Sequence, residues 1–250
     1  MTQITKRCQD CLQLIKLKQE DIIKVLTKIE TLSMAKDEIV RCVDLLENIE
    51  VQRDYLKKVY DSSMSSFLPL NQPMYSYLLQ VFLPSLILKR VYFRPPAGQV
   101  DIYVHLYQIL EDVSENIDVR PISRREFLHD CVLKSDIVNF TGKYDSVVEL
   151  MHELPKDCSV VYNGSAINPI VIGADAVLDN AITDSIAARL YNSGQDCMAP
   201  ACIFVDRRIS CEFLEKLKKH LSLLNVGNNG ESNAEIGPML EKESLILFQE

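Results

Sequence analysis

The sequence predicts an α/β fold in which helices cover a parallel β-sheet and a helical segment precedes the sheet. Two observations lead to this prediction. Apolar residues recur at helical spacing within residues 12–60, and from residue 91 onward short extended runs alternate with helical patterns. With 250 residues, 47% of them apolar and 25% charged, the chain can form one large or two modest globular domains. Sheets of this kind bind ligands at the carboxyl ends of their strands, so we expect the functional residues there.

The N-terminal segment, residues 12–60, is predicted to be helical. Its apolar residues are spaced three and four apart and fall into two sets, Ile22, Val25, Leu26, Ile29 and Leu32, then Ile39, Val43, Leu46 and Ile49. The lysines and glutamates between them indicate a solvated helix face, and an interaction arm is the alternative.

Two stretches lie between this segment and the first predicted strand. Asp61 to Ser66 is rich in serine and is interpreted as a linker. Met74 to Leu88 is apolar but interrupted by Gln80 and Pro84, and it is too short to span a bilayer. We interpret it as a buried helix, with membrane association as the alternative.

The remaining elements alternate between the two types. Extended runs are predicted at residues 91–93, 117–121, 136–140, 159–162, 169–173 and 201–205. Helices are predicted at residues 100–112, 145–154, 177–191 and 213–224. We place domain boundaries after residues 60 and 192, which gives a helical segment (1–60), a sheet domain (61–192) and a further domain that begins at residue 193.

Charge and cysteine usage narrow the class of protein. A net charge of −8 argues against nucleic acid or an anionic membrane as a partner. The eight cysteines lack the spacing of a disulfide framework, and no signal peptide precedes them, so we expect free thiols and a cytoplasmic location. Cys8-x-x-Cys11 lacks two further ligands at comparable spacing, and we expect no metal site.

One cysteine stands out from the others. Cys197 follows a turn of small residues, Ser193-Gly194, and precedes the extended run 201–205. A thiol in this position can be exposed beside backbone N–H groups, which favour the thiolate and can stabilise an oxyanion. The alternative is a small buried hydrophobic residue, which is what most cysteines are.

Six short motifs, one of which contains this cysteine, follow one another in a fixed order. They are Pro69-Leu70-Asn71-Gln72-Pro73, Phe93-Arg94-Pro95-Pro96, Phe140-Thr141-Gly142, Asn168-Pro169 with Ala174-Asp175 and Leu178-Asp179, Gly194-Gln195-Asp196-Cys197, and Ile236-Gly237-Pro238-Met239. In this order and at this spacing they resemble the motifs of the aldehyde dehydrogenase superfamily, over about residues 67 to 245. The resemblance implies a Rossmann-type dinucleotide-binding domain at 61–192, followed at 193–250 by the start of a catalytic domain that is incomplete.

The resemblance also assigns roles to single residues. It implies that Cys197 is the nucleophile and that the Asn71 amide helps to hold the oxyanion. It implies cofactor contacts for the strand-end residue Arg94 and for the turn Thr141-Gly142-Lys143, where lysine replaces the usual serine.

Departures from the family pattern modify the expected reaction. Asn163 occupies the position of the general base glutamate of hydrolytic members, and an amide cannot take a proton from water near neutral pH. The resemblance therefore favours transfer of the acyl group to a thiol such as coenzyme A, or reduction of an acyl thioester. Arg94 replaces a lysine and Ala97 replaces a ribose-binding acid, which favours NADP over NAD.

Further departures favour a different class of function. The usual glycine-rich stretch between Arg94 and Phe140 is missing, and a later family motif that holds the nicotinamide ribose is absent. Either the chain is a fragment of a longer one, or part of the site has been lost. The alternative to an enzyme is thus a degenerate binding or scaffolding module whose helices, 12–60, form a partner surface.

The expected partners follow from the predicted reaction. They are a small aldehyde or acyl thioester, with no nucleic acid and no membrane, and a homo-oligomer is considered only for a longer chain. The substrate, the direction of the reaction and the acyl acceptor stay open.

Overall fold

The computed structural model describes residues 3–52, 58–164 and 166–240. Their contacts divide the chain into two compact units. Unit 1 takes in the described residues of 1–26 and 35–164, and unit 2 those of 27–34 and 165–250. Each unit is described by itself below.

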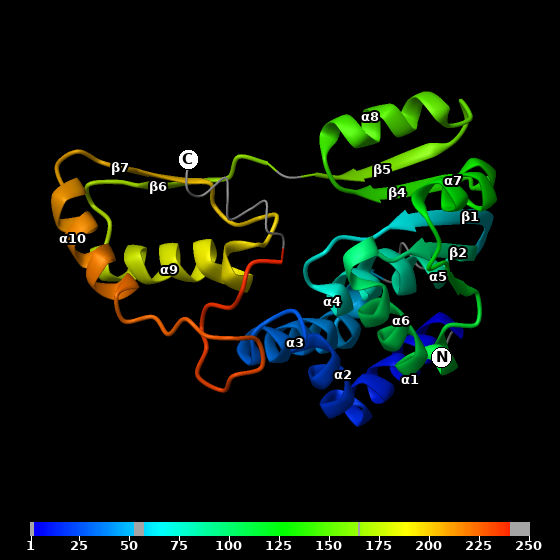
Figure 1. The fold of residues 1–250 in the computed structure, drawn as a ribbon, viewed down its shortest axis with the longest axis horizontal. Helices are drawn as coiled ribbons and strands as arrows, with labels where there is room; N and C mark the ends of the chain where they lie inside the picture. Colours follow the sequence, from blue (N-terminus) through cyan, green and yellow to red (C-terminus); the bar gives the residue numbers. More distant parts are fainter. Residues whose placement is uncertain (1–2, 53–57, 165, 241–250) are drawn as a thin grey trace. The chain divides into compact units, whose positions relative to one another are not determined.

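The described part of unit 1 contains a parallel sheet with the strand order β3-β2-β1-β4-β5 (Figure 1). Its strands are β1 (Tyr60–Phe67), β2 (Leu88–Arg94), β3 (Ile117–Val119), β4 (Ile137–Thr141) and β5 (Ser159–Asn163). The chain builds β1, β2 and β3 in one direction and then returns to the other side of β1 for β4 and β5. The order therefore reverses between β1 and β4, which is the topological switch point of a Rossmann-type fold.

The central strand β1 contradicts the prediction of a linker at Asp61 to Ser66. Ser65 and Ser66 are fully buried in it. The Ser65 hydroxyl shares a hydrogen bond with that of Ser135 at 2.8 Å, and the Ser66 hydroxyl accepts one from Asn139 Nδ2 at 2.7 Å. Because each buried hydroxyl has a partner, serine is tolerated in the middle of the sheet. The segment lacks the apolar alternation by which a strand is recognised in a sequence.

Helices cover both faces of this sheet. On one face α7 (Arg124–Asp130) and α8 (Tyr144–Glu153) pack against an apolar cluster that includes Phe67, Val138 and Phe140. On the other face Phe93 of β2 contacts the rings of Tyr77 and Tyr107, with centroids 5.5 and 6.0 Å away. Between β1 and β2 lie α4 (Pro73–Tyr77), the π-helical turn η2 (Leu78–Phe82) and α5 (Leu83–Ser85). Between β2 and β3 lie η3 (Ala97–Gln99), α6 (Val100–Ile109) and η4 (Glu111–Val113), and η5 (Val132–Lys134) follows α7.

The helical predictions are confirmed for most of the described residues, but residues 58–60 of the predicted helical segment are not helical and Tyr60 begins β1. The N-terminal segment forms α1 (Gln3–Leu17), α2 (Gln19–Leu26), α3 (Leu32–Glu47) and η1 (Ile49–Gln52), while residues 53–57 lie outside the described residues. Met74 to Leu88 is buried and helical for most of its length, as predicted. Helix α7 was not predicted, although Ser123 and Glu126 form the capping box that begins it.

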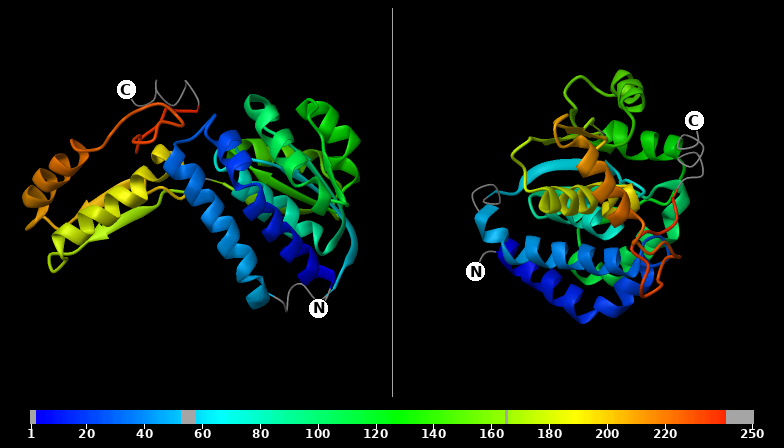
Figure 2. Two further views of the ribbon diagram at one scale, coloured as in Figure 1. Left: turned by 90° about the horizontal axis from the view of Figure 1, so that it is seen from below. Right: turned by 90° about the vertical axis from the view of Figure 1, so that its left-hand side faces the viewer.

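In unit 2 the described strands β6 (Pro169–Ile172) and β7 (Cys202–Val205) pair in parallel. The helix α9 (Leu178–Leu190) runs alongside these strands (Figure 2), and η6 (Tyr191–Gly194) and α10 (Ser210–Leu221) complete the unit's regular structure. Ile172, Ile182 and Phe213 form its small core, one from β6 and one from each of the two helices. The predicted strands and helices of this region are confirmed.

Candidate active site

Most of the predicted site residues of unit 1 lie at one edge of its sheet. Arg94 ends β2, Thr141 ends β4 and Asn163 ends β5, while Asn71 follows β1 by a few residues. Gly142 comes directly after Thr141. Because parallel strands end at the same edge, residues far apart in the sequence are gathered at the switch point, where open α/β sheets bind ligands.

A network of amides and hydroxyls connects the strands just inside this edge. Asn139 Nδ2 donates to Ser66 Oγ at 2.7 Å and to Gln80 Oε1 at 3.0 Å. The same Gln80 oxygen accepts from Thr141 Oγ1 at 3.0 Å. Asn139 Oδ1 accepts from Asn163 Nδ2 at 2.8 Å. Thr141 and Asn163 were predicted site residues, whereas Asn139, Gln80 and Ser66, which hold them, carry no sequence motif.

Asn163, at the position of the family's general base, is exposed at the end of β5. Its carbonyl oxygen accepts a hydrogen bond from the Gly142 N–H at 3.1 Å, and its side chain donates to Asn139. These contacts orient an amide and supply no base, because an amide has no basic lone pair near neutral pH.

Asn71 lies in a segment that helix α3 holds in place. The next residue, Gln72, has a left-handed backbone with φ of 51°, which is uncommon for a residue other than glycine. Arg41 Nη1 donates to Gln72 Oε1 at 2.6 Å, and its guanidinium lies 4.1 Å from the centroid of the Tyr75 ring. Glu38 Oε1 accepts from the Tyr75 N–H at 2.8 Å. Arg41 and Glu38 lie 30 or more positions before this segment, and no sequence pattern connects them to it.

Arg94 lies close to a second arginine. Its Nε donates to the Ile122 carbonyl at 3.0 Å. Burial, and then the positive charge of Arg124, lower the pKa of the Arg94 guanidinium. Arg124, which was not among the predicted site residues, is the first residue of α7 and is exposed. Two guanidinium groups that repel each other in this way attract an anion.

In unit 2 the loop before Cys197 has an unusual backbone. Asn192, Ser193 and Gly194 all have positive φ, at 48°, 58° and 76°. Cys197 is exposed beyond this turn, as the nucleophile prediction requires, and the buried alternative for this thiol is wrong. The Asp196 carboxylate accepts a hydrogen bond from the Met198 N–H at 2.7 Å, which closes a tight turn around the cysteine.

The structure also brings together two motifs of unit 2 that are about forty residues apart. The side chains of Ser193 and Gln195 bond to the backbone of the segment that contains Ile236-Gly237-Pro238. Asn71, Asn163 and the predicted cofactor residues belong to unit 1, and Cys197 belongs to unit 2. Their use in one reaction stays a prediction.

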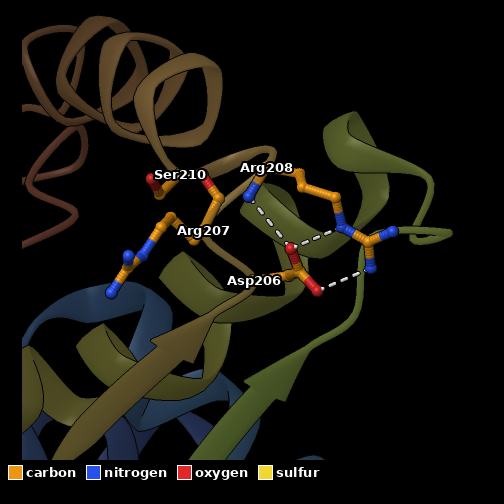
Figure 3. Close-up of polar contacts among 4 residues, drawn as sticks. All are labelled: Asp206, Arg207, Arg208 and Ser210. Atoms are coloured by element: carbon orange, nitrogen blue, oxygen red, sulfur yellow. Dashed lines mark hydrogen bonds and ion pairs between the residues drawn. The ribbon is translucent and has the colours of Figure 1, made fainter.

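A charged cluster at the start of α10 is not part of the candidate site. Figure 3 shows Asp206 joined to Arg208, whose Nε and Nη2 donate to the carboxylate at 3.0 and 2.9 Å. These bonds lower the pKa of Asp206. Arg207 extends away from that carboxylate, and the Ser210 hydroxyl donates to the Arg207 carbonyl at 3.0 Å. The cluster is explained as a turn held by an ion pair.

The two cysteines of the Cys8-x-x-Cys11 pair are not at the surface. Cys8 and Cys11 are buried in α1, and burial, followed by the neighbouring Cys8, raises the pKa of the Cys11 thiol. Within the described residues no group of three or more histidine, cysteine or acidic side chains could hold a metal ion. No helix in the described ranges is both long enough and apolar enough to cross a bilayer.

The sequence is similar to those of known aldehyde dehydrogenases. The model of the aldehyde dehydrogenase family matches residues 131–250. The NADP-dependent succinate-semialdehyde dehydrogenase GabD of Escherichia coli K12 is 28% identical over 116 residues, which cover 45% of this chain and 24% of the relative. A glutarate-semialdehyde dehydrogenase of Pseudomonas putida is 31% identical over a stretch that again covers 45% of this chain and 24% of the relative.

Solved structures extend the similarity to the whole fold. An NADP-dependent enzyme of E. coli has a TM-score of 0.85 at 19% identity, over 98% of this chain and 57% of that chain. An oxidoreductase of Marinobacter aquaeolei has a TM-score of 0.88 at 15% identity, over 97% and 56%. The present chain thus spans about a quarter of the length of the curated relatives and somewhat more than half of these structures.

Proposed function

We propose that this chain, whose residues 131–250 match the aldehyde dehydrogenase family, functions as an NAD(P)-dependent aldehyde dehydrogenase-like oxidoreductase with a cysteine nucleophile. The observation that carries this proposal is the exposed thiol of Cys197, which follows a tight turn within the family's nucleophile motif. An exposed thiol can reach a carbonyl carbon, whereas a buried one cannot.

The proposed chemistry begins at Cys197. Its thiolate forms a bond to the carbonyl carbon of an aldehyde, and the electron pair of the C=O bond moves to the oxygen. The resemblance gives the Asn71 amide the role of donor to this oxyanion. A bound nicotinamide cofactor supplies the hydride acceptor. With the cofactor bound, loss of the hydride to it would restore the C=O bond, and the acyl group would then be held on the Cys197 sulfur as a thioester.

The fate of this thioester depends on Asn163. An amide at this position does not activate water, so hydrolysis is slow. A thiol, for which coenzyme A is our candidate, attacks the acyl carbon, and Cys197 leaves as the thiolate. The product is a new thioester, and the same steps in reverse reduce an acyl thioester.

The carboxyl edge of the sheet in unit 1 suits a dinucleotide cofactor. The strand order reverses between β1 and β4, where sheets of this kind bind ligands. Gly142 follows β4 directly, in the turn to which the resemblance assigns a cofactor contact. The positive charge of Arg124 contributes to the lowered pKa of Arg94, and a bound anion would offset this repulsion. We assign this pair to the 2′-phosphate of NADP.

The first experiment titrates the protein with NADP and NAD. We expect saturable binding, with the dissociation constant for NADP about tenfold higher in Arg94→Met and in Arg124→Met, since each removes a charge-assisted contact. NAD binding should change little. Arg208→Met, which removes an arginine that is paired with Asp206 in unit 2, is the matched control.

The second experiment tests Cys197. Cys197→Ala should abolish turnover of an aldehyde while leaving nucleotide binding intact, and undiminished turnover would refute the assignment. Absence of both nucleotide binding and selective alkylation of Cys197 would instead favour the degenerate binding or scaffolding module.

A further inference from the structure

The loop that carries Cys197 does not hold its shape by local contacts alone. Asn192 and Ser193 are residues with a Cβ in the left-handed region, where side chains are disfavoured. Such a conformation persists only where the surrounding structure determines it. Local bonds are present, among them the Gln195 N–H to the Asn192 carbonyl at 3.0 Å and Arg189 Nη1 to the Gly194 carbonyl at 3.0 Å, the second from an exposed side chain.

The side chains of Ser193 and Gln195 also bond to a segment more than forty residues later in the sequence. Gln195 Nε2 donates to the Pro238 carbonyl at 3.3 Å, and Gln195 Oε1 accepts from the Leu240 N–H at 2.6 Å. The side-chain amide thus pairs with the backbone of residues 238 and 240 as a neighbouring strand would. Ser193 Oγ accepts from the Gly237 N–H at 2.8 Å.

The later segment has its own support within unit 2. A Cβ added to Gly237 would lie 2.7 Å from Asn229 Oδ1 and 3.0 Å from Thr31 Cγ2, so the backbone there is in close contact with residues 27–34. Backbone bonds between Asn225 and the N–H groups of Glu235 and Ile236, at 2.9 and 3.1 Å, fix the start of this segment. The cysteine loop is therefore tied to a supported segment.

We infer that Gln195 and Ser193 are positioning residues, which set the geometry of the Cys197 thiol by tying its loop to residues 237–240. This inference rests on the proposed function, because it assigns a role toward the nucleophile. Gln195 lies two residues before Cys197, so a shift of its amide moves the backbone that carries the thiol.

The test measures alkylation of Cys197 by iodoacetamide across a range of pH, with the modified peptide quantified by mass spectrometry. Cys211 is also exposed in unit 2 and serves as the internal reference. The variants are Gln195→Met, which keeps the size but loses both hydrogen bonds, Gln195→Glu, which keeps only the acceptor for Leu240, and Ser193→Ala. Asn228→Ala is the matched control, because it removes an exposed amide bonded to Glu231 in the same region.

In the wild type we expect Cys197 to react faster than Cys211. Gln195→Met should slow Cys197 about tenfold and alter its pH profile, in line with the loss of two hydrogen bonds. Ser193→Ala should act in the same direction with a smaller effect. Gln195→Glu adds a negative charge that disfavours the Cys197 thiolate at neutral pH. At high pH the thiol is ionised in every variant, so Gln195→Glu should recover part of the rate because it keeps the bond to Leu240. Cys211 in all variants, and Cys197 in Asn228→Ala, should keep the wild-type rate.

The two ways of failing are distinct. If Cys197 is reactive in the wild type and stays so in Gln195→Met and in Ser193→Ala, the inference is wrong while the proposed nucleophile stands. If Cys197 reacts no faster than Cys211 in the wild type, the proposed nucleophile is contradicted and the inference with it. Circular dichroism of each variant shows whether the fold is kept, and if Gln195→Met does not fold, Ser193→Ala decides.

Discussion

Replacement of Asn139 by alanine tests the polar network at the carboxyl edge of the sheet. Asn139 is 5% exposed and bonds to Ser66, Gln80 and Asn163 in the described part of the chain. The substitution leaves these partners in different situations. Ser66 is fully buried and loses its amide donor, Gln80 keeps the Thr141 hydroxyl, and the exposed Asn163 can bind water.

The magnitude follows from these three situations. A buried polar group left without a partner costs about 1–3 kcal/mol, and each of the other hydrogen bonds contributes about 0.5–1.5 kcal/mol. Because water restores part of the bond to Asn163, we expect Asn139→Ala to lower the free energy of unfolding by about 2–4 kcal/mol. Asn163→Ala should cost less, about 1 kcal/mol, since it removes a single bond from an exposed side chain.

Urea unfolding followed by far-ultraviolet circular dichroism measures these differences. Asn48→Ala is the control, because its exposed amide bonds only locally, to the Asp44 carbonyl at 2.9 Å, and its cost should stay within about 0.5 kcal/mol. A double-mutant cycle with Ser66→Ala should give a coupling energy of about 1 kcal/mol. The reasoning fails if Asn139→Ala costs no more than Asn48→Ala, or if the cycle shows no coupling.

Four further predictions concern single positions. Gly194→Ala should destabilise the protein by about 1–2 kcal/mol, seen as a lower Tm, because φ is +76° and a Cβ would lie 3.1 Å from Arg189 Nη1; an unchanged Tm would contradict this. The Ser63 N–H and O–H groups donate to the Asp136 carboxylate at 2.7 and 3.0 Å and lower the pKa of Asp136. The stability that these bonds contribute is therefore present above the unfolded pKa of about 4, and it is lost as the pH falls through the pKa of the folded state. Asp136→Asn should remove this acid-sensitive contribution, and equal slopes of stability against pH in both proteins would count against it. Asn163→Glu should raise hydrolytic release of acid from an aldehyde, measured by product analysis, and no increase would argue against the missing base. In thiol labelling of the native protein, the residues that stay unmodified until urea is added should be Cys8, Cys11, Cys42 and Cys131.

The sequence by itself determined which segments are helices and strands wherever apolar residues follow a regular period. It predicted the helices before residue 53 and the strands β2 to β7, and its motifs identified Cys197, Asn71 and Arg94 as candidates. These signals are local, because a helix or strand repeats its burial pattern within a few residues. The exposure of Cys197 was also foreseen, from the small residues of the preceding turn.

Only the tertiary structure decided how these parts support one another. The serine-rich β1 is a central strand because Ser135 and Asn139, about seventy positions later, supply partners for its buried hydroxyls. The fold also lets the charge of Arg124 act on Arg94, thirty positions earlier in the sequence. It likewise brings the Gln195 side chain within hydrogen-bond distance of the backbone of residues 238 and 240. Contacts of this kind join residues without any shared period or spacing, so they become visible only when the chain is folded.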